Sequence, residues 1–419
     1  MGRLDRCYNI EDLRRVAKKR LPRGMFEYVD LGTEDLIALG NNRSAFHDIK
    51  LLNKVITDIS DVRLDAELFG KPAALPMAIA PTSTAGLTWY EGEYELAKAA
   101  AAAGVPFILA TGSNTPMEKL AAEVGGRLWF QLYMWKEKHL SDELVKRAAD
   151  NGFETLVWTV DTGRGSNREH NLRNGFATPY VLNRTSVVDM LSHPTWLTTV
   201  MGRYIINGGL PRHVNYPKGY ELPMTGNVSL LRDKSMTSKR LDDATWEDAD
   251  RLRDIFPGEL IIKGIMRVDD AVQAAEHGVD GIVISNHGGR HMDSAPSTLD
   301  VLPDIVEAVG DKVTIFLDSG IRRGSDIVKA LALGADAVIT GRATLYGTAA
   351  GGEAGAAKAI SILKDEMKRT MAYIGTQRVA HIDHDVLWSG GNAMSGLGNS
   401  GNNARVEKAD KIDNIAKQA

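Results

Sequence analysis

The sequence predicts an α/β protein folded as an eight-stranded TIM (β/α)8 barrel, with a helical N-terminal extension and a long insertion after the fourth strand. Eight short apolar runs recur, and each is followed by a polar turn and a helix-like stretch. Their apolarity is continuous rather than alternating, which is typical of parallel strands buried on both faces. A doubly wound open sheet is the alternative, but it usually has fewer strands, and no glycine fingerprint follows the first run. The predicted strands are residues 75–80, 106–111, 127–133, 154–160, 259–264, 280–285, 313–318 and 336–341.

The chain is longer than a bare barrel, so it carries additions to that fold. It has 419 residues, whereas the barrel alone needs roughly 250. We assign residues 1–388 to the barrel domain, in which residues 1–70 form a mainly helical N-terminal segment. Its first helix reads "IEDLRRVAKKRLP" and ends at Pro22. Residues 389–419 are rich in Gly and Asn and predict a flexible tail.

Residues 177–243 form the insertion, and their composition differs from the rest of the chain. Between Arg184 and Arg240 there are eight Lys and Arg against three acidic residues, although the whole chain has a formal charge of −4. The first part, "VVDMLSHPTWLTTVMGRYII", is apolar and aromatic. Two interpretations stay open: a lid packed on the barrel mouth, or a segment that lies on an anionic membrane surface.

Composition limits the functional classes. The single cysteine, Cys7, excludes an internal disulfide framework and a cysteine zinc site. The charged N-terminus lacks the apolar core of a secretory signal, and no apolar run is long enough to span a bilayer. The negative net charge argues against nucleic acid as a partner. We therefore expect a cytoplasmic protein, with peripheral membrane attachment if the insertion lies on a membrane.

Polar residues gather where the predicted strands end. Catalytic groups of such barrels lie at the carboxyl ends of the strands, and the loops after strands seven and eight often hold phosphate. Those two loops read "DSGIRRGSD" and "TGRATLYG", in which glycines stand beside Arg322, Arg323 and Arg342. Free backbone N–H groups and arginines suit an anion. The sequence therefore predicts a ligand that carries phosphate.

The stretch "IVISNHGGRH" places a titratable imidazole, His287, three residues before Arg290 at a strand end. Asp161 follows another strand, and Arg168 follows "TVDTGRGSN". This set predicts a base, a carboxylate that holds its tautomer, and two cations for an anionic substrate. Lys263, at the end of "LIIK", is expected to face an anion in the barrel mouth. We predict no metal site and expect His291 on a solvated loop.

The chain resembles the FMN-dependent α-hydroxy acid oxidase and dehydrogenase family, which includes glycolate oxidase, L-lactate dehydrogenase and (S)-mandelate dehydrogenase. The resemblance runs from about residue 10 to 376 and rests on "LPRGMFEYVDLGTED", "WFQLY", "TVDTGRGSNREHNLRN", "IIKG", "SNHGGRHMD" and "LDSGIRRGSDIVKALALGADAV". The most specific feature is "SNHGGR" with Lys263 placed 24 residues before its histidine. The appearance is closest to the mandelate dehydrogenases.

This resemblance implies roles for individual residues. His287 is similar to the family's base and Asp161 to its carboxylate partner, while Tyr133 matches the tyrosine that bonds the substrate hydroxyl. Arg168 and Arg290, helped by Tyr28, would hold the substrate carboxylate, and Gly112 would line the space for its side chain. The implied FMN contacts are Pro81, Thr82, Ser83, Thr111, Gln131, Thr159, Lys263, Ser285, Asp318, Gly320, Arg322, Gly341 and Arg342.

The implied reaction is oxidation of an (S)-2-hydroxy acid to the 2-keto acid. Gly112 stands where several small-acid oxidases have tryptophan, which leaves room for an aromatic or bulky substituent. Electrons would pass to a membrane quinone or an electron-transfer protein, and a homotetramer is expected. The alternatives are an oxidase that forms hydrogen peroxide from oxygen and a non-redox FMN barrel isomerase.

Overall fold

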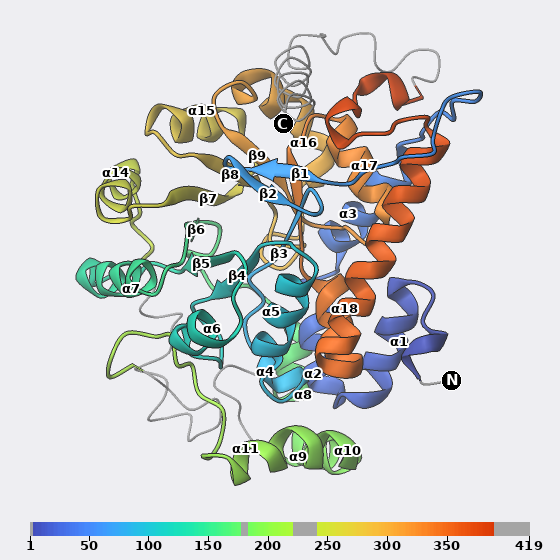
Figure 1. The fold of residues 1–419 in the computed structure, drawn as a ribbon. Coiled ribbons are helices and arrows are strands. Elements are labelled where there is room, and N and C mark those ends of the chain that lie inside the picture. The colour runs from blue at the N-terminus through green and yellow to red at the C-terminus, as the bar shows by residue number, and fades with distance from the viewer. Residues whose placement is uncertain (1–2, 177–182, 221–240, 389–419) are drawn as a thin grey trace.

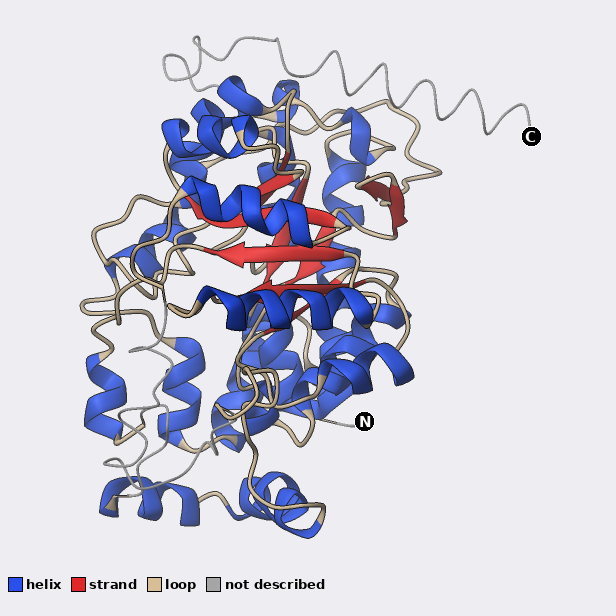
Figure 2. Ribbon diagram, turned by 90° about the vertical axis from the view of Figure 1, so that its left-hand side faces the viewer, coloured by secondary structure: helices blue, strands red, loops and turns tan. Residues whose placement is uncertain are grey.

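The computed structural model describes residues 3–176, 183–220 and 241–388 and confirms the barrel (Figure 1). Eight parallel strands close on themselves in the order β10-β3-β4-β5-β6-β7-β8-β9. Figure 2 shows them at the centre of the molecule, with helices around them. The strands are β3 (Met77–Ile79), β4 (Phe107–Ala110), β5 (Leu128–Leu132), β6 (Thr155–Thr159), β7 (Glu259–Ile265), β8 (Gly281–Ile284), β9 (Thr314–Leu317) and β10 (Ala337–Thr340).

Every predicted strand is present, and the continuous apolarity has a simple cause. Alternate residues of each strand point into two separate cores. Inside the barrel, Ile108, Trp129, Val157 and Phe316 belong to a closed cluster. Their strand neighbours pack outward with the surrounding helices in a second, larger cluster. Both faces are therefore buried, as the sequence predicts.

The N-terminal segment is helical as predicted, except at its end. It contains α1 (Ile10–Arg20), α2 (Arg23–Asp30) and α3 (Ile37–Asp48), and Pro22 stands directly before α2. The prediction missed an antiparallel hairpin of β1 (Ala66–Leu68) and β2 (Lys71–Ala73). At its turn the Phe69 ring lies 5.9 Å from that of Trp129 and 5.8 Å from that of Phe316. The hairpin thus covers one end of the barrel interior, and its three-residue strands are too short to show periodicity.

The remaining helices form the layer around the barrel. In the part of the chain that the structure describes, no helix is both long enough and apolar enough to cross a membrane. The longest, α18, is kinked at Gly351 and Gly352. The helices are α4 (Ala85–Thr88), α5 (Gly92–Ala102), α6 (Met117–Glu123), α7 (Lys138–Asp150), α8 (Glu169–Asn174), α14 (Trp246–Ile255), α15 (Val268–Glu276), α16 (Thr298–Val309), α17 (Gly324–Ala332) and α18 (Arg342–Tyr373), with short turns η1 (Leu4–Arg6), η3 (Val379–His381) and η4 (His384–Val386).

Residues 183–206 of the insertion form a helical layer at one end of the molecule, at the bottom of Figure 1, and residues 207–220 follow without a helix. Its elements are α9 (Arg184–Leu191), α10 (Pro194–Trp196), the π-helical turn η2 (Leu197–Gly202) and α11 (Arg203–Ile206). The Trp196 indole Nε1 donates to the carbonyl of Leu87, 2.7 Å away, which ties this layer to α4. Residues 177–182 and 221–240, and the predicted tail at 389–419, lie outside the described residues.

Candidate active site

A cavity of about 510 Å³ opens at the carboxyl ends of the barrel strands. This volume lies in the range of small-molecule and cofactor sites. Most predicted site residues line it: Tyr28, Pro81, Thr82, Ser83, Gly112, Tyr133, Thr159, Arg168, Lys263, His287, Arg290, Asp318, Gly320, Arg322, Gly341 and Arg342. The other predicted residues support this lining by hydrogen bonds: Thr111, Gln131, Asp161 and Ser285.

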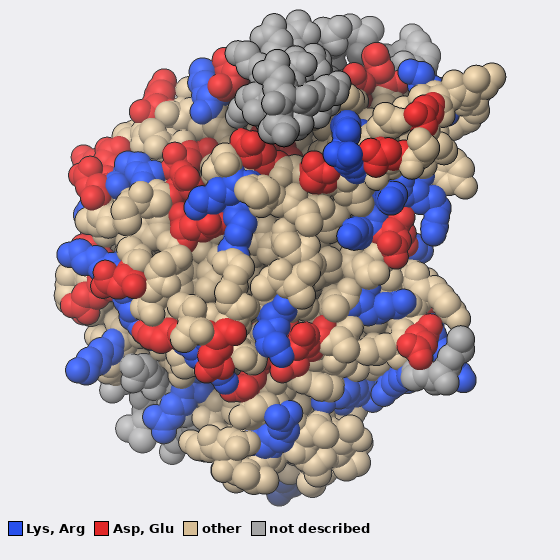
Figure 3. Space-filling model, in the orientation of Figure 1, with Lys and Arg blue, Asp and Glu red and all other residues tan. Residues whose placement is uncertain are grey.

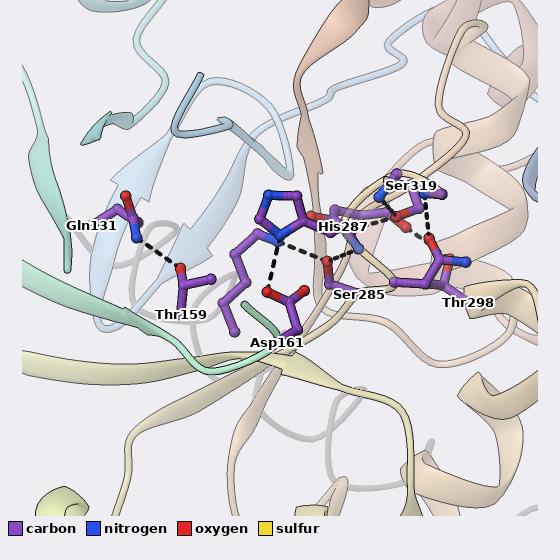
Figure 4. A network of polar contacts seen from close by, with 12 residues as sticks. Gln131, Thr159, Asp161, Ser285, His287, Thr298 and Ser319 are labelled. Atoms are coloured by element: carbon purple, nitrogen blue, oxygen red, sulfur yellow. Dashed lines mark hydrogen bonds and ion pairs between the residues drawn. The ribbon is translucent and has the colours of Figure 1, made fainter. Parts of the chain in front are cut away.

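His287 and Asp161 form the predicted pair (Figure 4). The Nδ1 atom of His287 lies 2.9 Å from Oδ1 of Asp161, and about a fifth of the imidazole is exposed. The backbone N–H of His287 also donates to Oγ of Ser285 over 3.0 Å. Because the carboxylate accepts the Nδ1 proton, the other ring nitrogen, Nε2, carries the lone pair of the neutral ring and can accept a proton.

The two glycines that follow His287 after β8 are required by the backbone. His287, Gly288 and Gly289 have φ angles of 55°, 68° and 70°, so three successive residues are left-handed. A Cβ on Gly288 would lie 2.6 Å from Nη1 of Arg342, and one on Gly289 would lie 2.6 Å from the Leu39 nitrogen. At His287 this conformation costs about 1–2 kcal/mol. The turn thus directs His287 to Asp161 at some cost in stability.

Asp161 reaches His287 because β7 is bulged beside it. The register between β7 and β8 shifts between Lys263 and Ile265, and Gly264 has a φ angle of 117°. A Cβ on Gly264 would lie 2.7 Å from Cβ of Asp161. Only glycine at 264 therefore leaves space for the carboxylate.

Lys263 is buried and has two polar partners. Its Nζ lies 2.7 Å from Oγ of Ser285 and 2.9 Å from Oδ2 of Asp318. Burial alone would lower the pKa of Lys263, but the carboxylates of Asp318 and Asp161 outweigh burial, and the net pKa is raised. The ammonium therefore keeps its charge inside the barrel mouth, where it faces an anionic group as predicted, here the carboxylate of Asp318.

The guanidinium groups of Arg168 and Arg290 both lie near the Tyr28 ring. Their guanidinium carbons are 5.8 Å and 5.2 Å from the Tyr28 ring centre. Nη1 of Arg290 donates to the carbonyls of Tyr28 and Leu31, over 2.8 Å and 3.1 Å. Burial, and then the charges of Arg168 and Arg342, lower the pKa of Arg290. A bound anion would relieve this repulsion between cations, so the arrangement favours a carboxylate ligand.

The pKa of His287 is lowered well below its ordinary value. Burial is the largest cause, and the charges of Lys263, Arg168 and Arg290 follow. The imidazole is therefore neutral at physiological pH, which is the state that a proton acceptor needs.

His291 is a site residue whose predicted place on a solvated loop was wrong. It lines the cavity, and its ring meets that of His287 edge to face with centres 4.4 Å apart. Burial, and then His287, lower the pKa of His291 to about 2. With Asp161 these histidines bring one possible metal-ligand atom each within 4.8 Å of one another, but the surrounding cations favour an anion. In the sequence, the one feature that pointed to this contact is that His291 stands four residues after His287, on the same turn.

A network of hydrogen bonds links the ends of β4, β5 and β6. Nε2 of Gln131 donates to Oγ1 of Thr159 over 3.0 Å (Figure 4). Oγ1 of Thr111 donates to the Gln131 carbonyl over 2.5 Å and accepts from the Tyr133 backbone over 3.1 Å. These bonds hold Thr159 and Tyr133 at the cavity wall.

The predicted phosphate loops contribute two of their three arginines to the cavity. Arg322 and Arg342 line it. Arg342 also donates to the backbone carbonyls of Val29, Gly288 and Leu31 over 3.0, 3.0 and 3.2 Å. Burial is the main cause that lowers the pKa of Arg342 to about 10. Arg323 instead pairs with Glu366 at 2.5 Å.

Two residues of the insertion also line the cavity, in keeping with the lid interpretation, although the sequence analysis named neither as a site residue. The rings of His213 and Tyr216 are stacked with centres 4.6 Å apart, and Nδ1 of His213 lies 3.0 Å from the Gly112 carbonyl. A Cβ on Gly112 would lie 2.8 Å from Oγ of Ser83 and 3.8 Å from Nδ1 of His213. The cavity wall near Gly112 is thus built partly by the insertion.

The residues fit an FMN group on their own chemistry. Arginines and glycines gather at the ends of β9 and β10, a buried cation lies at β7, and neutral hydrogen-bonding groups lie at β4 to β6. This order matches a phosphate at one end and a polar ring system at the other.

Comparisons with known proteins agree with this geometry. Residues 17–389 match the family model described as FMN-dependent dehydrogenase. The (S)-mandelate dehydrogenase of Pseudomonas putida is 38% identical over 92% of this chain and 94% of its own. An L-lactate oxidase of Nostoc sp. is 39% identical over 90% of this chain and 97% of its own. The crystal structure of the monotopic membrane protein (S)-mandelate dehydrogenase matches with a TM-score of 0.85 and 37% identity, over 91% of this chain and 99% of that one.

The relatives are oxidoreductases, so the isomerase alternative loses its support. The barrel, the histidine and arginine constellation and the family match agree with one another, and the chain belongs to the FMN-dependent dehydrogenases that oxidise 2-hydroxy acids.

Proposed function

We propose that this enzyme oxidises an (S)-2-hydroxy acid with an aromatic or bulky side chain, such as mandelate, to the 2-keto acid. One observation carries the proposal: a neutral histidine paired with Asp161 lies in the same cavity as two arginines. The reaction needs a proton acceptor for the hydroxyl group and fixed cations for the carboxylate.

The substrate would be held at its acid end. Arg168 and Arg290 would bind the carboxylate, helped by the hydroxyl group of Tyr28, and Tyr133 would bond the substrate hydroxyl. His287 would take the hydroxyl proton, and Asp161 would stabilise the imidazolium that forms. Each of these side chains lies in the cavity or directly behind it.

FMN, when bound, supplies the acceptor for the hydrogen that leaves the substrate carbon together with two electrons. Its phosphate would lie at Arg322, Arg342, Gly320 and Gly341, and Asp318 would contact the ribityl chain. Lys263 would stabilise negative charge on the ring. The remaining ring contacts would come from Pro81, Thr82, Ser83, Thr111, Gln131, Thr159 and Ser285.

Gly112 supports a large substrate side chain. No side chain at 112 fills the cavity, and the adjoining wall is the stacked pair of His213 and Tyr216. Aromatic walls favour a phenyl substituent. The relatives named for mandelate agree with this preference.

We further propose that the insertion acts as both lid and membrane surface. His213 and Tyr216 face the cavity, whereas α9 and α11 expose apolar residues, with Val188 67% and Ile206 83% accessible. The surface over these helices is mainly uncharged with isolated basic groups (Figure 3). This pattern suits the cytoplasmic face of an anionic membrane, and a similar solved protein is described as monotopic. Electrons would then pass to a membrane quinone or an electron-transfer protein.

The oxidase alternative keeps support from the relatives named as oxidases. Aerobic turnover without an added acceptor separates the two: rapid formation of hydrogen peroxide would refute the dehydrogenase form. A homotetramer remains a prediction, which the mass measured by light scattering would test.

Anaerobic mixing of the flavin-loaded enzyme with a panel of 2-hydroxy acids tests the proposal. We expect (S)-mandelate to bleach the flavin faster than L-lactate or glycolate, and (R)-mandelate to have no effect. Preference for the smallest acid would refute the assignment of the side chain, and no bleaching by any member would refute the reaction.

A further inference from the structure

The insertion supplies the cap of a helix that lies far away in the sequence. Helix α2 begins after Pro22, and no side chain at that position accepts its first N–H groups. The carboxylate of Asp189, in α9, accepts them instead. The backbone nitrogen of Arg23 lies 3.0 Å from Oδ1, and that of Gly24 lies 3.1 Å from Oδ2.

A carboxylate in this place stabilises α2 in two ways. It accepts charge-assisted hydrogen bonds from N–H groups that have no partner within the helix. Its negative charge also interacts favourably with the positive end of the helix dipole. The C-terminal half of α2 has other anchors, since Asp30 binds Arg14 and Tyr346, each over 2.6 Å. Among the described residues, Asp189 is the side chain bonded to the first N–H groups of α2.

Helix α2 in turn holds the acid-binding end of the cavity. It carries Tyr28, whose ring lies under the guanidinium groups of Arg168 and Arg290. The carbonyls of Tyr28 and Leu31, at the end of the helix, accept hydrogen bonds from Arg290. A shift of α2 along its axis would therefore move Tyr28 and an acceptor of Arg290 together.

We propose that Asp189 is a positioning residue for substrate binding, which acts through α2 on Tyr28 and Arg290. The insertion is then part of the acid-binding site as well as a surface segment. The inference rests on the proposed function in one respect, the binding of the substrate carboxylate by these arginines.

Steady-state kinetics of Asp189→Ala test the inference in the flavin-loaded enzyme. From the usual effect of losing a helix cap, we expect KM for the 2-hydroxy acid to rise about three- to thirtyfold. We expect kcat to change by less than about twofold, because the base His287 and its partner Asp161 keep their contact. Asp189→Asn keeps one acceptor oxygen without the charge, so its KM should lie between those of the unchanged enzyme and Asp189→Ala. Thr185→Ala, on the exposed side of the same helix, is the matched control.

A double-mutant cycle separates this role from general loss of stability. If Asp189 acts through α2, the substrate contact of Tyr28 that Asp189→Ala disturbs is already lost in Tyr28→Phe. The rise in KM of the double variant should then be smaller than the product of the two single rises. A full product, or a fall in kcat at constant KM, would overturn the inference. If Asp189→Ala does not fold, the same cycle with Asp189→Asn decides.

Hydrogen exchange gives a readout that needs no activity. The amides at the start of α2 should exchange faster in Asp189→Ala and at the normal rate in Thr185→Ala. Unchanged exchange would refute the cap even if KM rises. If no 2-hydroxy acid reduces the flavin, the proposed function fails, whereas this measurement still decides whether Asp189 holds the helix.

Discussion

Replacing Asp161 by Asn should slow substrate oxidation severely while leaving the fold intact. The amide keeps an oxygen that can accept the Nδ1 proton of His287 but removes the negative charge. In the structure that charge lies 2.9 Å from Nδ1. At an effective dielectric constant of about 20, a unit charge at this distance is worth at most about 6 kcal/mol to the imidazolium. Solvent relaxation reduces this limit, and we expect the rate of flavin reduction to fall about 10²- to 10⁴-fold.

The assay is anaerobic stopped-flow reduction of the bound flavin by (S)-mandelate. The surface pair of His277 and Asp250 provides the control, because its Nδ1 to Oδ1 distance is 2.7 Å and it lies outside the cavity. In the Asp250→Asn variant, (S)-mandelate should reduce the bound flavin at the normal rate. A fall of less than tenfold in Asp161→Asn, with the flavin fully bound, would show that the carboxylate does not support proton transfer to His287.

Three further predictions follow from the site. Arg168→Met should lower kcat/KM about ten- to hundredfold by raising KM, because a charge-assisted hydrogen bond to the substrate is lost. The control is Arg173→Met, at an exposed position on α8, which should change neither kcat nor KM in the same steady-state assay. Stability should fall as pH drops below about 6.5, because the folded-state pKa values of His287 and His291 are lowered and the unfolded chain takes up protons first. In denaturant titrations at several pH values, His291→Gln should reduce this slope by about 1.4 kcal/mol per pH unit, and an unchanged slope would contradict the buried neutral state. Gly112→Ala should lower the free energy of unfolding by about 1 kcal/mol, because the new Cβ lies 2.8 Å from Oγ of Ser83 and forces that hydroxyl to rotate. In thermal unfolding, the double variant with Ser83→Gly should regain the lost stability, and no recovery would show that another contact causes the loss.

The barrel could be predicted because its signal is local. Each strand is an apolar run with two buried faces, and Asp161, Lys263 and His287 stand at the end of a strand or within three residues of it. The sequence therefore predicts that His287, Asp161 and Lys263 lie together, since the carboxyl ends of parallel strands meet at one rim. The hairpin at residues 66–73 escaped prediction because three-residue strands carry no periodicity.

The residues that were missed depend on contacts between distant segments. His213 and Tyr216 reach the cavity through the insertion, whose path no periodic pattern describes. His291 was predicted on a loop because its burial depends on a left-handed turn that brings it back against His287.

The sequence by itself determined the eight-stranded barrel, the family and the chemical groups at the strand ends, because periodicity and short motifs encode them within a few neighbouring residues. Tertiary structure alone decided which groups share a hydrogen bond. In the folded chain Asp189 accepts hydrogen bonds from the start of α2, and Arg323 pairs with Glu366 instead of lining the cavity. Arg342 lines the cavity but donates hydrogen bonds to backbone carbonyls. Such partners are set by the packing of segments far apart in the chain, which local sequence does not specify.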